Sequence, residues 1–357
     1  MTLFALVAAL YLAFVNGAND NFKGFATVWG SASLGYRGAL AMATLATIAG
    51  GLVSVLLANG LVQQFSGKGL VPDALVATPA FALAVAGGAA ITVGLATRLG
   101  FPISTTHALI GGLLGAGFGS GATVAVGKLG SAFVLPLLSS PLIASLLAFA
   151  AYRAFCRLMP ARTPHCACIV AATAAPGGVL ARDGEATLVF GHAEDCARNP
   201  AVLASARMPA PRDLLHIATA MAICFARGLN DTPKLAALLI AGGAFATVGA
   251  GWVVAAAMAA GGLLLARRVA ETMSRRITSL DPGQGIAANV VTAAMVLGAS
   301  AAGLPVSTTH VSVGSIIGVG SSAHTAHWPV IREVLASWLL TLPIAAVSAA
   351  AIAAFSA

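Results

Sequence analysis

The sequence predicts an all-α polytopic membrane protein made of two inverted-topology repeats with broken helices and two re-entrant hairpins. Of its 357 residues, 59% are hydrophobic and 8% are charged, and the mean hydropathy is +0.93. Soluble domains carry roughly 25% charged residues, so this chain cannot cover a water-facing surface. Apolar runs of about 20 residues, long enough to cross the hydrocarbon core, recur along most of the chain. Two motifs also occur twice, in the same order.

The distribution of charge predicts the orientation. The formal net charge is +8, and most arginines lie in the connecting segments 152–213 and 266–285. Such clustering is typical of cytoplasmic loops and argues against a nucleic-acid partner. Both termini and the weakly charged stretch 59–79 are then extracytoplasmic. The first apolar run, Thr2 to Val15, lacks the basic region of a cleavable signal peptide. We therefore expect a multi-pass protein in the lipid bilayer of a bacterial inner membrane.

The apolar stretches divide the chain into three parts: a first membrane repeat at 1–151, a central cytoplasmic insert at 152–213, and a second, inverted repeat at 214–357. Crossings are expected near 2–22, 37–58, 124–151, 214–232, 237–266 and 332–355. Two longer apolar regions, near 80–121 and 285–320, are each interrupted by proline and hydroxyl residues. We interpret them as re-entrant hairpins, because irregular backbone at membrane depth is tolerated only where it lines a protein cavity. Three crossings in each half make the halves inverted.

The repeat is also visible in the residues. The segment from Phe14 to Lys23 and the segment from Phe225 to Lys234 share the pattern F-x-x-G-x-N-D-x-x-K. Both hairpins carry P-x-S-T-T-H followed by a glycine-rich run, beginning at Pro102 and at Pro305. Inverted repeats with interrupted helices that meet near the bilayer midplane are the design of secondary transporters.

Two acidic residues stand out among the eleven in the chain. Only Asp20 and Asp231 fall deep within apolar segments, and they occupy equivalent repeat positions. A carboxylate at the centre of the bilayer costs at least ~2.5 kcal/mol, so it normally marks an ion or substrate path. The alternative is a carboxylate that caps a broken helix or pairs with its neighbouring lysine.

The hydroxyl clusters supply neutral donors for an oxyanion, together with backbone N–H groups at a helix start. They comprise Ser104, Thr105 and Thr106 in the first hairpin and Ser307, Thr308 and Thr309 in the second. Alternatively, these residues only cap the helices that begin there. A site that combines donors with carboxylates suits an anion that enters together with Na⁺ or H⁺.

These paired motifs resemble the inorganic phosphate transporter (PiT) family over 1–151 and 214–357. The resemblance implies an inverted-repeat fold, usually a homodimer, that cotransports phosphate with Na⁺ or H⁺. It implies that the six hydroxyl residues contact the anion, and that anion and coupling ion are coordinated by Asn19, Asp20, Asn230 and Asp231. Some members resemble sulfate permeases, so sulfate or a related tetrahedral oxyanion remains the alternative substrate.

Other classes of protein fit less well. The Ser and His residues of the hairpins have no third group to orient them, so we expect no enzyme. No Gly-x-x-x-x-Gly-Lys-Ser/Thr loop for a nucleotide is present. An ion channel would need a continuous lined pore, which inverted halves with broken helices do not favour.

Many family members have small or neutral residues after the first Asn-Asp, where this chain has Lys23. A lysine after the second, here Lys234, is less unusual, so the departure from the family pattern lies in having both. Lys23 and Lys234 follow the acidic residues by three positions, within reach on a helix. We hypothesise that their ammonium groups partly replace a bound metal cation and so favour H⁺ coupling or a different anion. Alternatively, both lysines extend towards the membrane rim. Arg98 and Arg227 are weaker candidates for anion contact, with orientation or extension to the rim expected for both.

The insert holds four of the five cysteines. Strands are expected at 169–173 and 186–190, forming a β-hairpin. The metal-ligating residue types near its base are His165, Cys166, Cys168, His192 and Cys196. They predict a structural zinc site, although their spacing is not that of a standard zinc finger. The alternative is ordinary reduced thiols. No other cofactor is expected beyond the coupling cation.

Overall fold

A computed structural model describes residues 1–57, 62, 65–130, 135–158, 165–170, 187–192, 202–207, 211–241 and 245–356. The chain divides into two compact units. One contains Met1–Phe155 together with His216–Ala357, and the other contains Cys156–Leu215. The two predicted membrane repeats therefore lie within a single compact unit.

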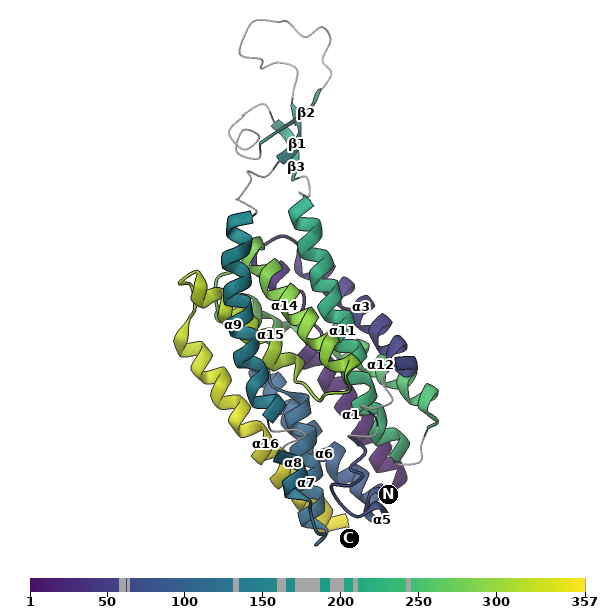
Figure 1. The fold of residues 1–357 in the computed structure, drawn as a ribbon. Helices are drawn as coiled ribbons and strands as arrows, with labels where there is room; N and C mark the ends of the chain where they lie inside the picture. The colour runs from purple at the N-terminus through teal and green to yellow at the C-terminus, as the bar shows by residue number, and fades with distance from the viewer. Residues whose placement is uncertain are drawn as a thin grey trace, which may run out of the picture. The chain divides into compact units, whose positions relative to one another are not determined.

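All named secondary-structure elements of the larger unit are helices (Figure 1). Its first half contains α1 (Thr2–Asp20), α2 (Ala26–Gly30), α3 (Tyr36–Leu57), α5 (Asp73–Val76), α6 (Pro79–Leu99), α7 (Thr105–Gly119), α8 (Val126–Leu129) and α9 (Leu135–Leu158). Its second half contains α11 (Pro211–Ala241), α12 (Thr247–Leu265), α13 (Arg267–Glu271), the π-helical turn η2 (Thr272–Arg276), α14 (Pro282–Ala301), α15 (Thr308–Ser322) and α16 (Trp328–Ser356).

Within the described ranges, seven helices are long and apolar enough to cross a membrane. They are α1, α3, α6, α9, α12, α14 and α16. Both termini lie at the same end of the helical unit (Figure 1). This arrangement agrees with the multi-pass membrane protein expected from the sequence.

One predicted boundary is wrong. Separate crossings were expected at 214–232 and 237–266, but α11 continues through Pro233 to Ala241 and α12 begins at Thr247. A proline inside a helix removes one backbone hydrogen bond and costs ~3 kcal/mol, so the tertiary packing of α11 must offset it. The equivalent segment of the first half does break, because α1 ends at Asp20 and five residues separate it from α2.

Each predicted hairpin is a pair of helices joined by a short irregular break. The helices α6 and α7 pack on each other, as do α14 and α15. Gly100 ends α6 with φ of 80°, in the left-handed region that glycine adopts at a helix end. Ser104 and Ser307 are the N-caps of α7 and α15, and their side-chain oxygens accept from the backbone N–H of His107 (3.1 Å) and His310 (3.2 Å). The capping role considered for these serines is therefore present.

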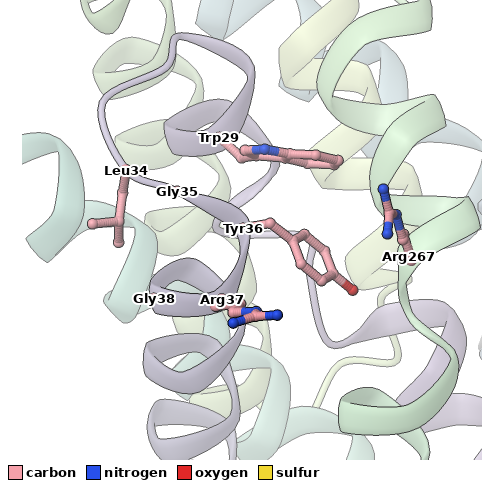
Figure 2. Close-up of a pocket in the computed structure, with 7 residues that line it drawn as sticks. All are labelled: Trp29, Leu34, Gly35, Tyr36, Arg37, Gly38 and Arg267. Carbon is pink, nitrogen blue, oxygen red and sulfur yellow. The ribbon is translucent and has the colours of Figure 1, made fainter.

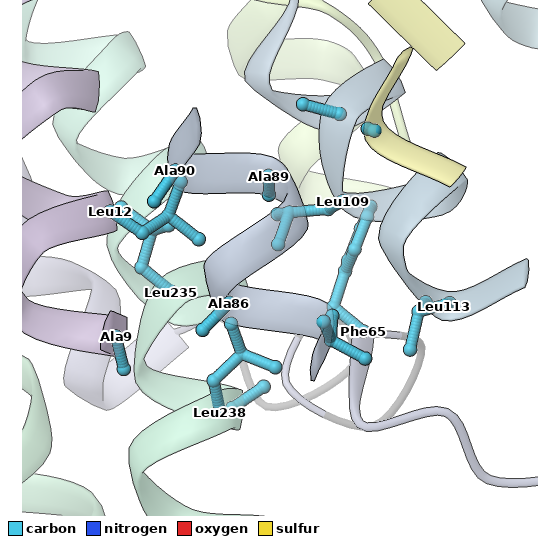
Figure 3. Close-up of a cluster of buried hydrophobic side chains, with 14 of the residues drawn as sticks. Ala9, Leu12, Phe65, Ala86, Ala89, Ala90, Leu109, Leu113, Leu235 and Leu238 are labelled. Atoms are coloured by element: carbon cyan, nitrogen blue, oxygen red, sulfur yellow. The ribbon is translucent and has the colours of Figure 1, made fainter. Parts of the chain in front are cut away.

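The largest apolar core joins helices from both halves (Figure 3). Leu12 of α1, Leu109 of α7 and Leu235 of α11 belong to it, among many alanines of α6. Between transmembrane helices no hydrophobic effect operates, so small residues that allow close packing provide the cohesion.

Glycines show how closely the two halves pack. A side chain at Gly17 of α1 would collide with the backbone of Met258 of α12, and one at Gly228 of α11 would collide with the backbone of Thr47 of α3. Gly17 and Gly228 are equivalent positions of the duplicated motif. In each half, the motif glycine therefore packs directly against the backbone of a helix from the other half.

The smaller unit contains a three-stranded antiparallel sheet in the order β2-β1-β3. Its strands are β1 (His165–Val170), β2 (Thr187–His192) and β3 (Val202–Arg207). The predicted strand at 169–173 begins earlier, at His165, and β3 was not predicted. The β3 sequence begins with three apolar residues in a row, so it lacks the strict alternation of apolar and polar side chains that identifies strands.

Candidate functional site

The tips of the two hairpins meet in the protein interior. The hydroxyl of Thr309 donates to the carbonyl oxygen of Ile103 (2.7 Å), and the hydroxyl of Thr106 lies 3.4 Å from the carbonyl oxygen of Val306. Thr106 and Thr309 are equivalent residues of the two P-x-S-T-T-H motifs, as are Ile103 and Val306. The sequence-predicted hydroxyl clusters therefore lie together, and all six residues are buried.

Each asparagine of the duplicated motif holds the tip of its own hairpin. The Asn19 amide donates to Thr97 Oγ1 (3.0 Å) and to the Phe101 carbonyl (3.0 Å), and its Oδ1 accepts from Ile103 N (3.1 Å). Asn230 Nδ2 lies 3.4 Å from the Val306 carbonyl, and its Oδ1 accepts from Ser300 Oγ (3.3 Å). Both asparagines are thus positioning residues for the breaks.

Both lysines pair with the neighbouring carboxylate. Lys23 Nζ lies 2.6 Å from Asp20 Oδ1, and Lys234 Nζ lies 3.5 Å from Asp231 Oδ1. All four residues are buried, and the two lysines are each 1% exposed. The alternative in which the lysines extend towards the membrane rim therefore does not hold.

Each ammonium group also reaches the hydroxyl cluster of the opposite half. Lys23 Nζ donates to Thr309 Oγ1 and lies 3.3 Å from Thr308 Oγ1. Lys234 Nζ donates to Thr106 Oγ1 (3.0 Å) and to the Val306 carbonyl (3.0 Å). Hydroxyl, ammonium and carboxylate groups from both repeats thus converge on one buried region.

Arg227 adds a third cation that the sequence reasoning underrated. It is 1% exposed, its Nη2 donates to Asn16 Oδ1 (2.6 Å), and its Nε lies 3.5 Å from Asp231 Oδ2. Asn16 in turn donates to Thr105 Oγ1 (2.9 Å) and contacts Asp20 Oδ2 (3.2 Å). Arg227 occupies the motif position equivalent to Asn16, so the two equivalent positions of the duplicated motif contact each other directly.

The position of Arg227 offered a signal that could have identified it. It lies in an apolar helix, one turn before Asp231, where a buried guanidinium needs a carboxylate partner. Arg98, the other arginine proposed for anion contact, lies outside the site. It is exposed on α6, and its backbone carbonyl accepts a hydrogen bond from Arg268 Nη1 (2.6 Å).

The five charged residues of this site have a formal charge with a small positive excess. Lys23, Lys234 and Arg227 carry three positive charges and Asp20 and Asp231 carry two negative charges, which leaves +1. The N-termini of α7 and α15 add the positive ends of two helix dipoles. This electrostatic arrangement favours an anion at the hairpin tips.

The histidines that end the motifs pack together rather than face the carboxylates. The rings of His107 and His310 are 4.5 Å apart between centroids, and His310 stacks on Trp338 of α16 at 3.9 Å. Trp338 Nε1 donates to the Pro102 carbonyl (2.9 Å) at the first hairpin tip. Trp338 therefore supports the tip, a role that the sequence motif did not indicate.

The zinc expectation for the insert gains no support in the part of the chain that the structure describes, where no group of three metal-ligating residues occurs. His165 and His192 are direct partners in the β1–β2 register. Cys168 is disulfide-bonded, so its sulfur is not the thiolate that a zinc site requires. Cys196 lies outside the described residues.

A multi-pass helical protein with two helix breaks that join hydroxyls, carboxylates and buried cations at its centre belongs to the class of membrane transporters. Residues 16–349 match the phosphate transporter family, and the chain belongs to that family. This membership agrees with the PiT resemblance and with the expectation that the chain is not an enzyme.

Individual relatives extend over nearly the whole chain. The chain is 28% identical to a chloroplastic inorganic phosphate transporter 2-1 of Arabidopsis thaliana, over 96% of this chain and 70% of the relative. It is also 28% identical to a probable low-affinity inorganic phosphate transporter of Mycobacterium bovis, over 97% of this chain and 75% of the relative. A solved structure titled "The sodium-dependent phosphate transporter" has the same fold, with a TM-score of 0.76, 23% identity, and coverage of 99% of this chain and 98% of that one.

Proposed function

We propose that this chain is a symporter that imports inorganic phosphate together with H⁺ across the cell membrane, with both termini outside. Membership of the phosphate transporter family supports the substrate class. The convergence of hydroxyl donors and buried cations at the hairpin tips is the structural observation that carries the proposal. The proposed anion contacts are the hydroxyls of Ser104, Thr105, Thr106, Ser307, Thr308 and Thr309.

One oxygen atom favours phosphate over sulfate. Asp231 Oδ2 is buried and lies 3.5 Å from Arg227 Nε, which is longer than a strong charge-assisted hydrogen bond of about 2.7–2.9 Å. Phosphate at neutral pH carries at least one O–H group that can donate to a carboxylate, whereas sulfate carries none. Asp231 is therefore suited to select a protonated tetrahedral oxyanion.

The lysines support H⁺ as the coupling ion rather than Na⁺. A Na⁺ site would be expected to use the carboxylate oxygens of Asp20 and Asp231, but each of these groups already has an ammonium partner three residues further along the chain. A second cation beside either pair would meet like-charge repulsion in a region of low dielectric constant. A proton can instead be carried by the substrate or exchanged within the pairs without a separate metal site.

The test is uptake of labelled phosphate into proteoliposomes that contain the purified protein, with Na⁺ and pH gradients imposed separately. Uptake driven by an inward proton gradient, insensitive to Na⁺ and to a large excess of sulfate, is expected. Uptake that requires Na⁺ would refute the coupling but leave the substrate intact. Uptake of labelled sulfate in place of phosphate would identify the protein as a sulfate transporter with the same fold.

A substitution of Asp231 tests whether this residue selects phosphate over sulfate. Asp231→Asn preserves the shape of the side chain and removes the strong acceptor, so selectivity against sulfate is expected to fall. The matched control is Asp73→Asn, which makes the same change in an exposed residue of α5. If Asp231→Asn discriminates between the two anions as well as the wild type does, Asp231 is not the selecting group.

A further inference from the structure

A pocket of about 420 Å³, lined by none of the hairpin-tip residues, lies between the segment that joins α2 to α3 and the first residue of α13 (Figure 2). Trp29 and Tyr36 form one side of it, and Arg37 and Arg267 supply guanidinium groups. Its volume falls within the range of about 300–1,000 Å³ that is usual for small-molecule sites.

The chemistry of the pocket is that of an anion receptor with aromatic walls. The Arg267 guanidinium lies 5.9 Å from the centre of the Tyr36 ring, and the Arg275 guanidinium lies 4.4 Å from the centre of the Trp29 ring. The Arg37 side chain is exposed, and Arg267 pairs with one carboxylate, that of Glu271 (3.1 Å). Three arginines and one glutamate leave a local excess of positive charge. Arginine forks bind phosphate groups in a bidentate manner.

The depth of the pocket matches the headgroup layer of a bilayer. Tyr36 is the first residue of α3, and Arg267 comes two residues after α12 ends at Leu265. Both helices are long and apolar enough to cross the membrane. Trp and Tyr are enriched at this boundary, and the arginine-rich segment 266–285 is expected on the cytoplasmic side, where anionic lipids face basic residues.

We propose that this pocket binds the phosphate group of an anionic phospholipid, with Arg37 and Arg267 as its direct contacts. Trp29 and Tyr36 flank the less polar part of the headgroup, as amphipathic rings do at the interface. The occupant is a lipid and not free phosphate, because the site lies at the ends of two membrane-crossing helices.

Lipid in this pocket would contact the segment that carries the buried site. The Phe22 ring stacks on Tyr36, with 5.2 Å between centroids, and meets Trp29 edge-on at 5.5 Å. Phe22 is the immediate neighbour of Lys23. Occupancy of the pocket therefore steadies the segment that holds the Asp20–Lys23 pair, and this consequence for transport rests on the proposed function.

Native mass spectrometry of the purified full chain in non-ionic detergent tests binding without any transport measurement. The probes are phosphatidylglycerol, phosphatidylcholine and inorganic phosphate. The wild type is expected to retain phosphatidylglycerol preferentially. The double variant Arg37→Gln with Arg267→Gln is expected to lose about 25-fold in retention, from about fivefold for each arginine near an anionic headgroup.

Two further variants make the test specific. Arg332→Gln, which changes an exposed arginine near the start of α16, should bind lipid as the wild type does. Gly35→Leu keeps every arginine and adds a large apolar side chain to the pocket lining, where a side chain at Gly35 meets nothing within 4 Å, so the space beside the arginines should narrow. Loss of retention in Gly35→Leu is expected even if the double glutamine variant folds poorly.

Three results would overturn the proposal. Equal retention by the wild type and Gly35→Leu would show that lipid binds elsewhere. An equal loss in Arg332→Gln would indicate a general effect of basic surface charge. Displacement of phosphatidylglycerol by millimolar inorganic phosphate would identify a site for the free anion. None of these outcomes depends on whether the chain transports phosphate, so the two proposals can fail separately.

Discussion

The ammonium group of Lys23 donates a hydrogen bond to the hydroxyl of Thr309, which lies 286 residues further along the chain. The equivalent lysine, Lys234, donates to Thr106, the residue equivalent to Thr309 in the first hairpin. Each half thus supplies the cation for the hydroxyl cluster of the other half. A change in either hairpin is therefore expected to alter the surroundings of the lysine in the opposite repeat.

Removing either shared hydroxyl should weaken phosphate binding. Thr106→Val and Thr309→Val keep the side-chain shape, and hydrogen bonds to charged groups contribute about 1.5–3 kcal/mol, so KM should rise about 10- to 150-fold. Initial rates of phosphate uptake into proteoliposomes measure this. Thr341→Val is the control, since that buried hydroxyl donates to the Ser337 carbonyl within its own helix, α16. An unchanged KM in Thr309→Val would remove that hydroxyl from the binding site.

The Asp20–Lys23 pair should show strong coupling in stability. Asp20→Asn leaves a buried ammonium group without its carboxylate, and breaking a buried pair costs about 3–5 kcal/mol. The double variant Asp20→Asn with Lys23→Met should recover much of that loss. Unfolding of the detergent-purified proteins completes the double-mutant cycle. Simple additivity of the two single changes would mean that the pair does not act as a unit.

Removing both lysines should change the coupling ion. In Lys23→Ala with Lys234→Ala the two carboxylates lose their ammonium partners, so Na⁺ should begin to stimulate phosphate uptake and the dependence on the proton gradient should weaken. Lys68→Ala, at an exposed position, serves as the control. If the double variant keeps the wild-type pH dependence and ion preference, the lysines do not determine coupling.

A methyl group at Gly17 should disrupt the packing between α1 and α12. Gly17→Ala would place a carbon against the backbone of Met258, and overpacking of this kind typically costs about 1–3 kcal/mol. Gly298→Ala in α14 makes the same change where nothing lies within 4 Å, and there the expected effect is neutral or slightly stabilising. Thermal unfolding in detergent compares the two. Equal transition temperatures would contradict the close packing of α1 on α12.

Local patterns predicted the features that depend on neighbouring residues. Charge content and apolar runs indicated a membrane protein, and the Pro-x-Ser-Thr-Thr-His motif located both helix breaks. The three-residue spacing placed Lys23 beside Asp20, as the structure has it. Burial of Asp231 also followed from its position within an apolar segment.

Contacts between distant segments were not predictable in the same way. The pairing of Lys23 with the second hairpin and of Arg227 with Asn16 depends on how helices pack, which spacing along the sequence does not record. The continuity of α11 through Pro233 was missed for a related reason, because tertiary packing overrides the helix-breaking tendency of proline.

The reciprocal fit of Gly17 against Met258 and of Gly228 against Thr47 has a consequence for biogenesis. During synthesis the first half emerges from the ribosome and enters the bilayer before α11 and α12 exist. Its glycine surface then has no partner, so its final packing must wait for the second half. Two separately expressed fragments, divided within the insert, are therefore expected to accumulate only when they are made in the same cell.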